Sequence, residues 1–186
     1  MSIRKIRVFG DPVLRTKAAA VEDFDRSVRR LVGDLGETLI DASGAGLAAP
    51  QIGVSLRVFV FVDADEDSPS YGEVRHLVNP ELHDISADTV VDEEGCLSIP
   101  GLYYELARPQ RLVARGFDAH GEPLEIAGSE RLARALAHET DHLDGVLFID
   151  RLPPDERKRA LREIREMQMA GEDVVIKRSP HGGVVG

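Results

Sequence analysis

The sequence contains no tryptophan and a single cysteine, Cys96, and only 5% of its residues are aromatic. One cysteine excludes an intrachain disulfide, so the fold must depend on its core. No run of about eighteen apolar residues is present, which excludes a typical membrane-spanning helix. The first residues lack the apolar segment of a signal peptide, so we expect a cytoplasmic protein with no membrane partner.

A surplus of positive charge is also missing. The chain has 23 Lys and Arg against 33 Asp and Glu, a net charge of −10. General nucleic-acid binders need a basic surface, so we expect no DNA partner. A chain of 186 residues with 42% hydrophobic composition can bury a full-sized core. We therefore expect a single domain over residues 1–186.

Short expected strands before and around a central helix predict an α+β fold. Asp25 and Ser129 are the expected N-caps of two helices. The expected helices cover residues 26–42, 130–143 and about 155–170. The expected strands cover residues 56–62, 76–82, 89–93, 112–117 and 123–126. A flexible tail is expected at residues 179–186.

The segment from His138 to His142 reads His-Glu-Thr-Asp-His. Residues four apart share one face of a helix, so His138 and His142 can ligate one metal ion. Glu139 then stands beside the ion, where a general base acts on a water molecule. The alternative is a pair of core histidines and a surface glutamate, but burying such groups without partners is costly. Asp141 and Asp144 are the expected imidazole acceptors.

Cys96 lies in the segment Glu-Gly-Cys-Leu-Ser-Ile-Pro, residues 94–100. A lone cysteine is usually a small buried hydrophobic residue. Here Pro100 is expected to end a strand, and a cysteine at such an end can present its thiolate to a metal. With His138 and His142 it would give three protein ligands and one open position, the arrangement of catalytic metals.

Small residues crowd the segment Gly-Ala-Gly-Leu-Ala-Ala-Pro-Gln, residues 44–51. Such a backbone can pack closely against a ligand, and the Gln51 amide could bind a developing oxyanion. The alternative is a helix C-cap followed by a tight turn.

These three segments, in this order, resemble the motifs of the peptide deformylase family. The matching motifs are Gly-x-Gly-Leu-Ala-Ala-x-Gln at 44–51, Glu-Gly-Cys-Leu-Ser at 94–98 and His-Glu-x-x-His at 138–142. The resemblance extends from residue 10 to residue 152. It implies a peptide-deformylase-like fold, in which short antiparallel sheets surround a central metal-binding helix, with further helices near both ends.

The resemblance also implies an activity, hydrolysis of the N-formyl group from the first methionine of newly made polypeptides. The implied metal ligands are Cys96, His138 and His142. The ion is typically Fe²⁺, which Zn²⁺, Ni²⁺ or Co²⁺ can replace. Glu139 would be the general base and then the acid. Gln51 and the backbone N–H of Leu97 would bind the oxyanion.

Further residues are expected near the substrate, a nascent formyl-methionyl peptide. Gly46 and Leu47 would help to form a pocket wall that excludes acetyl groups. The peptide could lie as an extended strand beside Gly44 and Gly46. Tyr103 stands where some members have a basic residue that meets the peptide backbone. Glu94, its ionic partner Arg108, and Asp141 are expected to lie behind the metal ligands and hold them in place.

A contact with the ribosome is expected through the last helix, since the substrate emerges there. Its basic residues are Arg157, Lys158, Arg159, Arg162 and Arg165. Two alternatives remain open. A zinc endopeptidase would draw its third ligand from downstream, where the only histidine is His181 in a Gly-rich tail. A non-catalytic metal-stabilised module would be expected to lack Glu139 and Gln51.

Overall fold

The computed structural model describes residues 2–64 and 66–170. Its strands are β1 (Gly46–Ala48), β2 (Val58–Val62), β3 (Val74–His83), β4 (Thr89–Cys96), β5 (Ile99–Pro109), β6 (Arg111–Phe117) and β7 (Pro123–Ser129). Its α-helices are α1 (Arg26–Ala42), α2 (Glu130–Leu143) and α3 (Pro154–Met169). Short 3₁₀ helices are η1 (Pro12–Arg15), η2 (Ala49–Ile52) and η3 (Phe148–Arg151). The predicted α+β class is confirmed.

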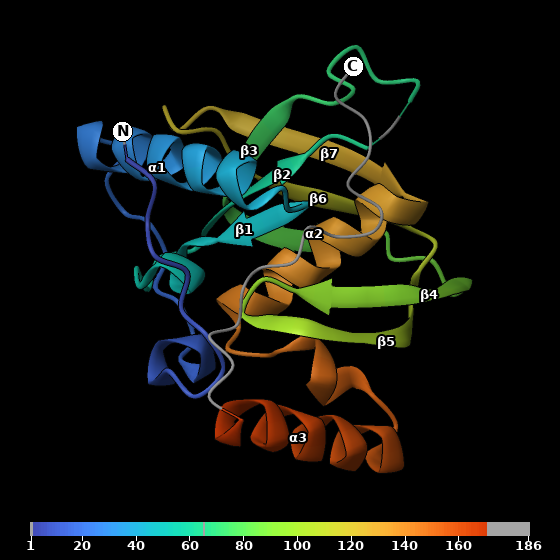
Figure 1. The fold of residues 1–186 in the computed structure, drawn as a ribbon. Helices are drawn as coiled ribbons and strands as arrows, with labels where there is room; N and C mark the ends of the chain where they lie inside the picture. Colours follow the sequence, from blue (N-terminus) through green and yellow to red (C-terminus); the bar gives the residue numbers. More distant parts are fainter. Residues whose placement is uncertain (1, 65, 171–186) are drawn as a thin grey trace.

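The largest sheet has the strand order β1-β2-β3-β6-β7, with antiparallel neighbours throughout. Side chains of β2 alternate between its two faces, as strand geometry requires. Phe59 and Phe61 pack with residues of α2, whereas Val58 and Val60 pack with residues of α1. The two helices therefore cover opposite faces of this sheet (Figure 1).

Helix α1 begins and ends where its sequence predicts. The Asp25 carboxylate accepts a hydrogen bond from the Ser27 N–H at 2.7 Å, which satisfies a free donor of the first turn. Val28, Leu31, Leu35 and Leu39 form its buried stripe. The helix ends at Ala42, and the C-cap residue Ser43 adopts the left-handed conformation with φ of 53°. The chain then turns directly into edge strand β1.

The second sheet is the β4–β5 hairpin, and its second strand was not predicted. Pro100 does not end a strand; it is the second residue of β5, where a missing backbone donor is tolerated. The preceding strand ends four residues earlier, at Cys96. Every second residue of β5 is buried, which is the period of two expected of a strand. Leu102, Tyr104 and Leu106 pack together in one hydrophobic core cluster.

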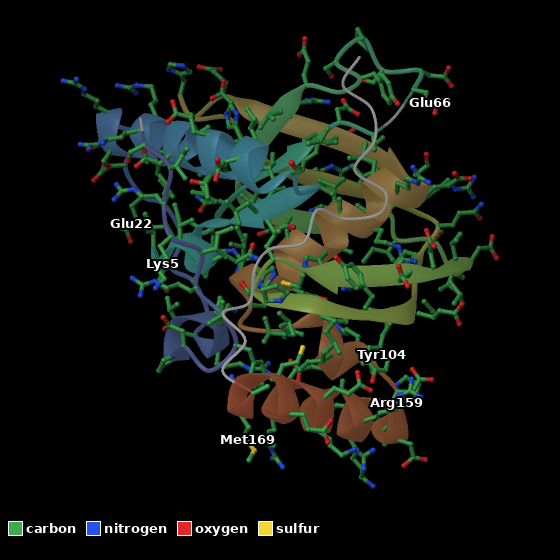
Figure 2. The ribbon with its side chains drawn as sticks, viewed as in Figure 1. Lys5, Glu22, Glu66, Tyr104, Arg159 and Met169 are labelled. Carbon is green, nitrogen blue, oxygen red and sulfur yellow. The ribbon has the colours of Figure 1, made fainter. Side chains whose placement is uncertain are left out.

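Helix α3 packs against the β4–β5 hairpin through Ala160 and Ile164, which belong to the same core cluster (Figure 1). Polar contacts also hold it there. The Tyr104 hydroxyl donates to Glu163 and accepts from Arg159, both at 3.0 Å (Figure 2). The predicted tail at residues 179–186 lies outside the described residues, so the single domain over 1–186 stays a prediction.

Helix α2 lies between the large sheet and the β4–β5 hairpin (Figure 1). Leu132, Leu136 and Leu143 pack against the sheet, while another face of the helix meets the hairpin. Ser129 occupies the N-cap position without the expected side-chain hydrogen bond. Among the described residues, no helix is long and apolar enough to cross a membrane. The fold thus buries the histidine-bearing helix at its centre.

Candidate metal centre

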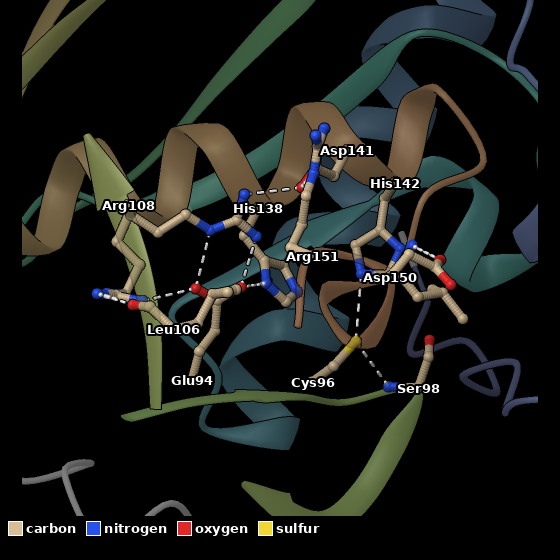
Figure 3. Close-up of polar contacts among 12 residues, drawn as sticks. Glu94, Cys96, Ser98, Leu106, Arg108, His138, Asp141, His142, Asp150 and Arg151 are labelled. Carbon is tan, nitrogen blue, oxygen red and sulfur yellow. Dashed lines mark hydrogen bonds and ion pairs between the residues drawn. The ribbon is translucent and has the colours of Figure 1, made fainter. Parts of the chain in front are cut away.

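Three metal-ligating side chains meet where α2 faces the end of β4. His138 and His142 lie one turn apart on α2, and Cys96 is the last residue of β4. Their ligand atoms all lie within 4.8 Å of one another. Cys96 Sγ is 3.2 Å from Nε2 of His142 (Figure 3). The predicted set of one thiolate and two imidazoles is therefore assembled as one metal-binding group.

The chemistry of these donors fits a divalent ion. A sulfur and two nitrogens leave one coordination position open, as in catalytic rather than structural sites. Within the described chain, Oε2 of Glu139 and Nδ1 of His142 are buried without a hydrogen-bond partner. Burial lowers the pKa of His142 and so favours the neutral imidazole that binds metals.

Glu94 orients the first histidine. One of its carboxylate oxygens lies 2.7 Å from Nδ1 of His138 (Figure 3), which leaves Nε2 for a metal. The expected ion pair with Arg108 is present, with contacts of 2.6 and 3.0 Å. Burial alone would raise the pKa of Glu94, but hydrogen bonds from His138 and Arg108 hold it below its usual range. Glu94 is thus a carboxylate that can accept a hydrogen bond from the imidazole N–H of His138.

Neither of the aspartates expected as imidazole acceptors has that role. Asp141 accepts from Arg108 at 2.7 Å and from Arg151 at 2.6 Å. Asp144 pairs with Arg57 at 2.7 Å. The acceptor is Glu94, which comes from β4 and not from the helix, so helical spacing could not reveal it. Asp141 instead supports the site through Arg108.

Glu139 lies beside the ligands and is only 3% exposed. Burial raises the pKa of Glu139 to about 7, which lies in the range where a carboxylate is an effective general base near neutral pH. A Cβ atom at position 46 would collide with its carboxylate. Gly46 therefore allows edge strand β1 to approach the base closely.

Gln51 is held with its amide in one orientation. Its Oε1 accepts from the Ala48 N–H at 2.8 Å. Its Nε2 donates to Ser98 Oγ at 3.1 Å and lies 3.7 Å from Cys96 Sγ. The NH₂ group thus faces the cysteine ligand. Ser98 was missed as a site residue, although it is the last residue of the cysteine motif.

Replacing Ser98 by alanine tests this orientation. The buried Gln51 NH₂ would lose an acceptor, which costs about 1–3 kcal/mol when a buried donor is left unsatisfied. We expect a lower free energy of unfolding in urea and a lower kcat, because the Gln51 amide can then rotate. A lower free energy of unfolding with an unchanged kcat would show that Ser98 contributes to stability and not to catalysis.

The other expected site residues surround this group. Leu97 occupies the turn between β4 and β5, and its side chain reaches toward Gly44, where a Cβ would come within 2.8 Å of it. The ring of Tyr103 lies over Gly95 and is 36% exposed. Leu47 is fully buried and packs with the apolar side chains of α1, so it does not form the exposed pocket wall that was expected of it.

The ligand geometry bears on the endopeptidase alternative. The third ligand near the histidines is Cys96, 42 residues before the first of them. His181, the downstream candidate, lies outside the described residues. Glu139 and Gln51 both stand at the site, which a degenerate binding module would not require. The arrangement favours hydrolysis.

Comparisons with known proteins agree with this geometry. The family model described as polypeptide deformylase matches residues 3–158. A peptide deformylase of Acidothermus cellulolyticus is 59% identical over 181 residues, which cover 97% of this chain and 96% of the relative. A crystal structure of a Legionella pneumophila peptide deformylase is 40% identical, with a TM-score of 0.81 over 92% of this chain and 99% of that chain.

A Thermus thermophilus peptide deformylase is 41% identical, also with a TM-score of 0.81, over 90% of this chain and 96% of that chain. These similarities extend far beyond the three motifs and include the arrangement of the sheets around α2. The resemblance inferred from residues 44–51, 94–98 and 138–142 is confirmed. This chain belongs to the polypeptide deformylase family.

Proposed function

We propose a role for each site residue in the reaction by which this metal-dependent hydrolase removes the N-formyl group from newly made polypeptides. The observation that carries the proposal is the convergence of Cys96, His138 and His142 beside a buried, unpaired Glu139 oxygen. A thiolate and two imidazoles bind a divalent ion, and a carboxylate that is not a ligand remains free to move protons.

The ion would be held by Cys96, His138 and His142. When bound, it supplies Lewis-acid polarisation and water activation. Glu139 accepts the proton of the attacking water and later donates it to the leaving amine nitrogen as the carbon–nitrogen bond breaks, so that formate is released. The Gln51 amide and the Leu97 N–H donate to the oxygen on which negative charge develops.

The peptide part of the substrate would extend edge strand β1. Among the sheet strands, β1 pairs with β2 on one side only. A peptide lying beside Gly44 and Gly46 can therefore add a strand. The exposed Tyr103 ring would contact residues that follow the first methionine. The close approach of Gly46 to Glu139 supports a narrow space that admits formyl and excludes acetyl.

A paired assay tests this function. The metal-loaded chain should release formate from formyl-Met-Ala-Ser and no acetate from acetyl-Met-Ala-Ser. Replacing Gly46 by alanine should depress formate release, because the added methyl group would displace Glu139. Comparable release of acetate and formate by the wild-type chain would contradict the proposed pocket.

Fe²⁺ is the proposed native ion, with Zn²⁺, Ni²⁺ or Co²⁺ as replacements. A mixed sulfur and nitrogen site binds Ni²⁺ and Zn²⁺ more tightly than Fe²⁺, so the purified chain can carry a different metal. A ferrous thiolate site is also sensitive to oxidation at Cys96. We expect peroxide to inactivate the ferrous form faster than the nickel form, measured as residual formate release. Equal decay rates would contradict this expectation.

The proposed cellular setting is the cytoplasm, with a ribosomal contact through α3. Arg157 pairs with Asp150, and Arg159 contacts Tyr104, so these two arginines hold α3 to the body of the protein. Arg162 and Arg165 are exposed. Reversing the charges of these two should reduce co-sedimentation with ribosomes and spare formate release. Unaltered co-sedimentation would refute the contact.

A further inference from the structure

Arg134 reaches from α2 to both strands of the neighbouring hairpin. One guanidinium nitrogen donates to Glu94 Oε2 at 2.8 Å. The other terminal nitrogen donates to the backbone oxygens of Val90 and Leu106, each at 2.9 Å. Three acceptors on two strands are therefore bound by one side chain of the helix.

These contacts join the two elements that carry the metal ligands. Arg134 lies four residues before His138, so the two project from the same face of α2. Val90 and Glu94 belong to β4, the strand that ends at Cys96. Arg134 thus spans the interface between the cysteine strand and the histidine helix, over sequence separations of 28 to 44 residues.

The same arginine also affects the orientation of His138. Glu94 presents one oxygen to His138 (Figure 3) and uses the other to accept from Arg134. Arg108 contacts both oxygens, but it belongs to the same hairpin as Glu94. Arg134 is therefore the arginine that holds this carboxylate directly from the histidine helix.

We propose that Arg134 is a positioning residue of the metal centre, which fixes the spacing between Cys96 and the histidine pair and orients His138 through Glu94. The inference rests on the proposed metal-ligand roles and adds to them a residue outside the three family motifs. Arginine suits this role because its planar fork can bind several acceptors at fixed angles, whereas lysine offers a point charge.

Arg131 provides a matched control. It lies one turn before Arg134 on α2, and both arginines line a cavity beside β4 and β5. It is exposed, and its side chain has no hydrogen bond or ion pair to another described residue. Arg131→Met and Arg134→Met each remove one positive charge from this region. A difference between them therefore reports the contacts of Arg134 rather than the loss of charge.

The experiment measures metal binding without relying on activity. The Co²⁺ dissociation constant is determined by chelator competition, and the thiolate-to-cobalt charge-transfer band reports the geometry at Cys96. Changing residues that orient metal ligands typically weakens metal affinity about 10–100-fold. We expect about a tenfold loss and a shifted band in Arg134→Met, no change in Arg131→Met, and an intermediate affinity in Arg134→Lys.

Wild-type affinity and an unshifted band in Arg134→Met would overturn the inference. So would a lower free energy of unfolding of the metal-free variant with unchanged Co²⁺ affinity, because that result defines a purely structural residue. If Arg134→Met does not fold, wild-type affinity in Arg134→Lys overturns it instead. Failure of the wild-type chain to form the cobalt–thiolate band would overturn the ligand set, and this inference with it.

Discussion

Replacing Glu139 by glutamine should lower kcat by about 10²–10⁴-fold, the usual contribution of a general base. The amide cannot accept the proton that the attacking water releases. The substitution keeps the size of the side chain, so the close approach of Gly46 is preserved. Because Glu139 supplies none of the converging ligand atoms, the metal content should remain that of the wild-type chain.

The measurement pairs steady-state formate release with metal analysis of the same sample. Glu166→Gln, at an exposed position on α3, is the control and should behave as the wild-type chain. Wild-type turnover in metal-loaded Glu139→Gln would show that another group is the base. Loss of the metal would instead place Glu139 among the ligands.

Replacing Cys96 by serine should remove most of the metal and, with it, the activity. A serine hydroxyl remains protonated near neutral pH, whereas a metal-bound cysteine is a thiolate. Changing a residue that only orients a ligand weakens metal affinity by about 10–100-fold, so losing the ligand itself should cost more. In the described part of the chain, the one converging ligand group of this kind contains Cys96.

Metal affinity by chelator competition provides the test, with circular dichroism to show that the metal-free variant is folded. Formate release should fall in parallel with metal occupancy. Tight metal binding by Cys96→Ser would contradict the thiolate assignment. It would favour a set of His138, His142 and Glu139, in which the carboxylate is a ligand and not a base.

Local periodicity was sufficient for the elements that form the core. The apolar spacing in α1, the Asp25 cap and the near-continuous hydrophobic run of β2 correspond to observed structure. The metal ligands were also predictable, because two of them share one helical face and the third lies in a distinctive sequence segment. These signals each lie within a few residues of the chain.

Contacts between distant segments were less predictable. Strand β5 was missed because Pro100 indicates a strand end when tertiary pairing is unknown. Ser98 binds Gln51 across 47 residues, and Arg134 binds Glu94 across 40. A helix pattern places Asp141 near His138, but only the packing of β4 against α2 brings Glu94 to the ring. The orientation of the ligands is therefore a tertiary property.

The most direct test of the metal centre is a titration of the metal-free wild-type chain with Fe²⁺ or Ni²⁺, in which bound metal and formate release from formyl-Met-Ala-Ser are measured together. Because the described residues form one such ligand group, we expect the rate of formate release to rise in proportion to bound metal. It should reach its maximum at a single ion per chain. Formate release by the metal-free chain, or none at full occupancy, would contradict a metal centre built from Cys96, His138 and His142.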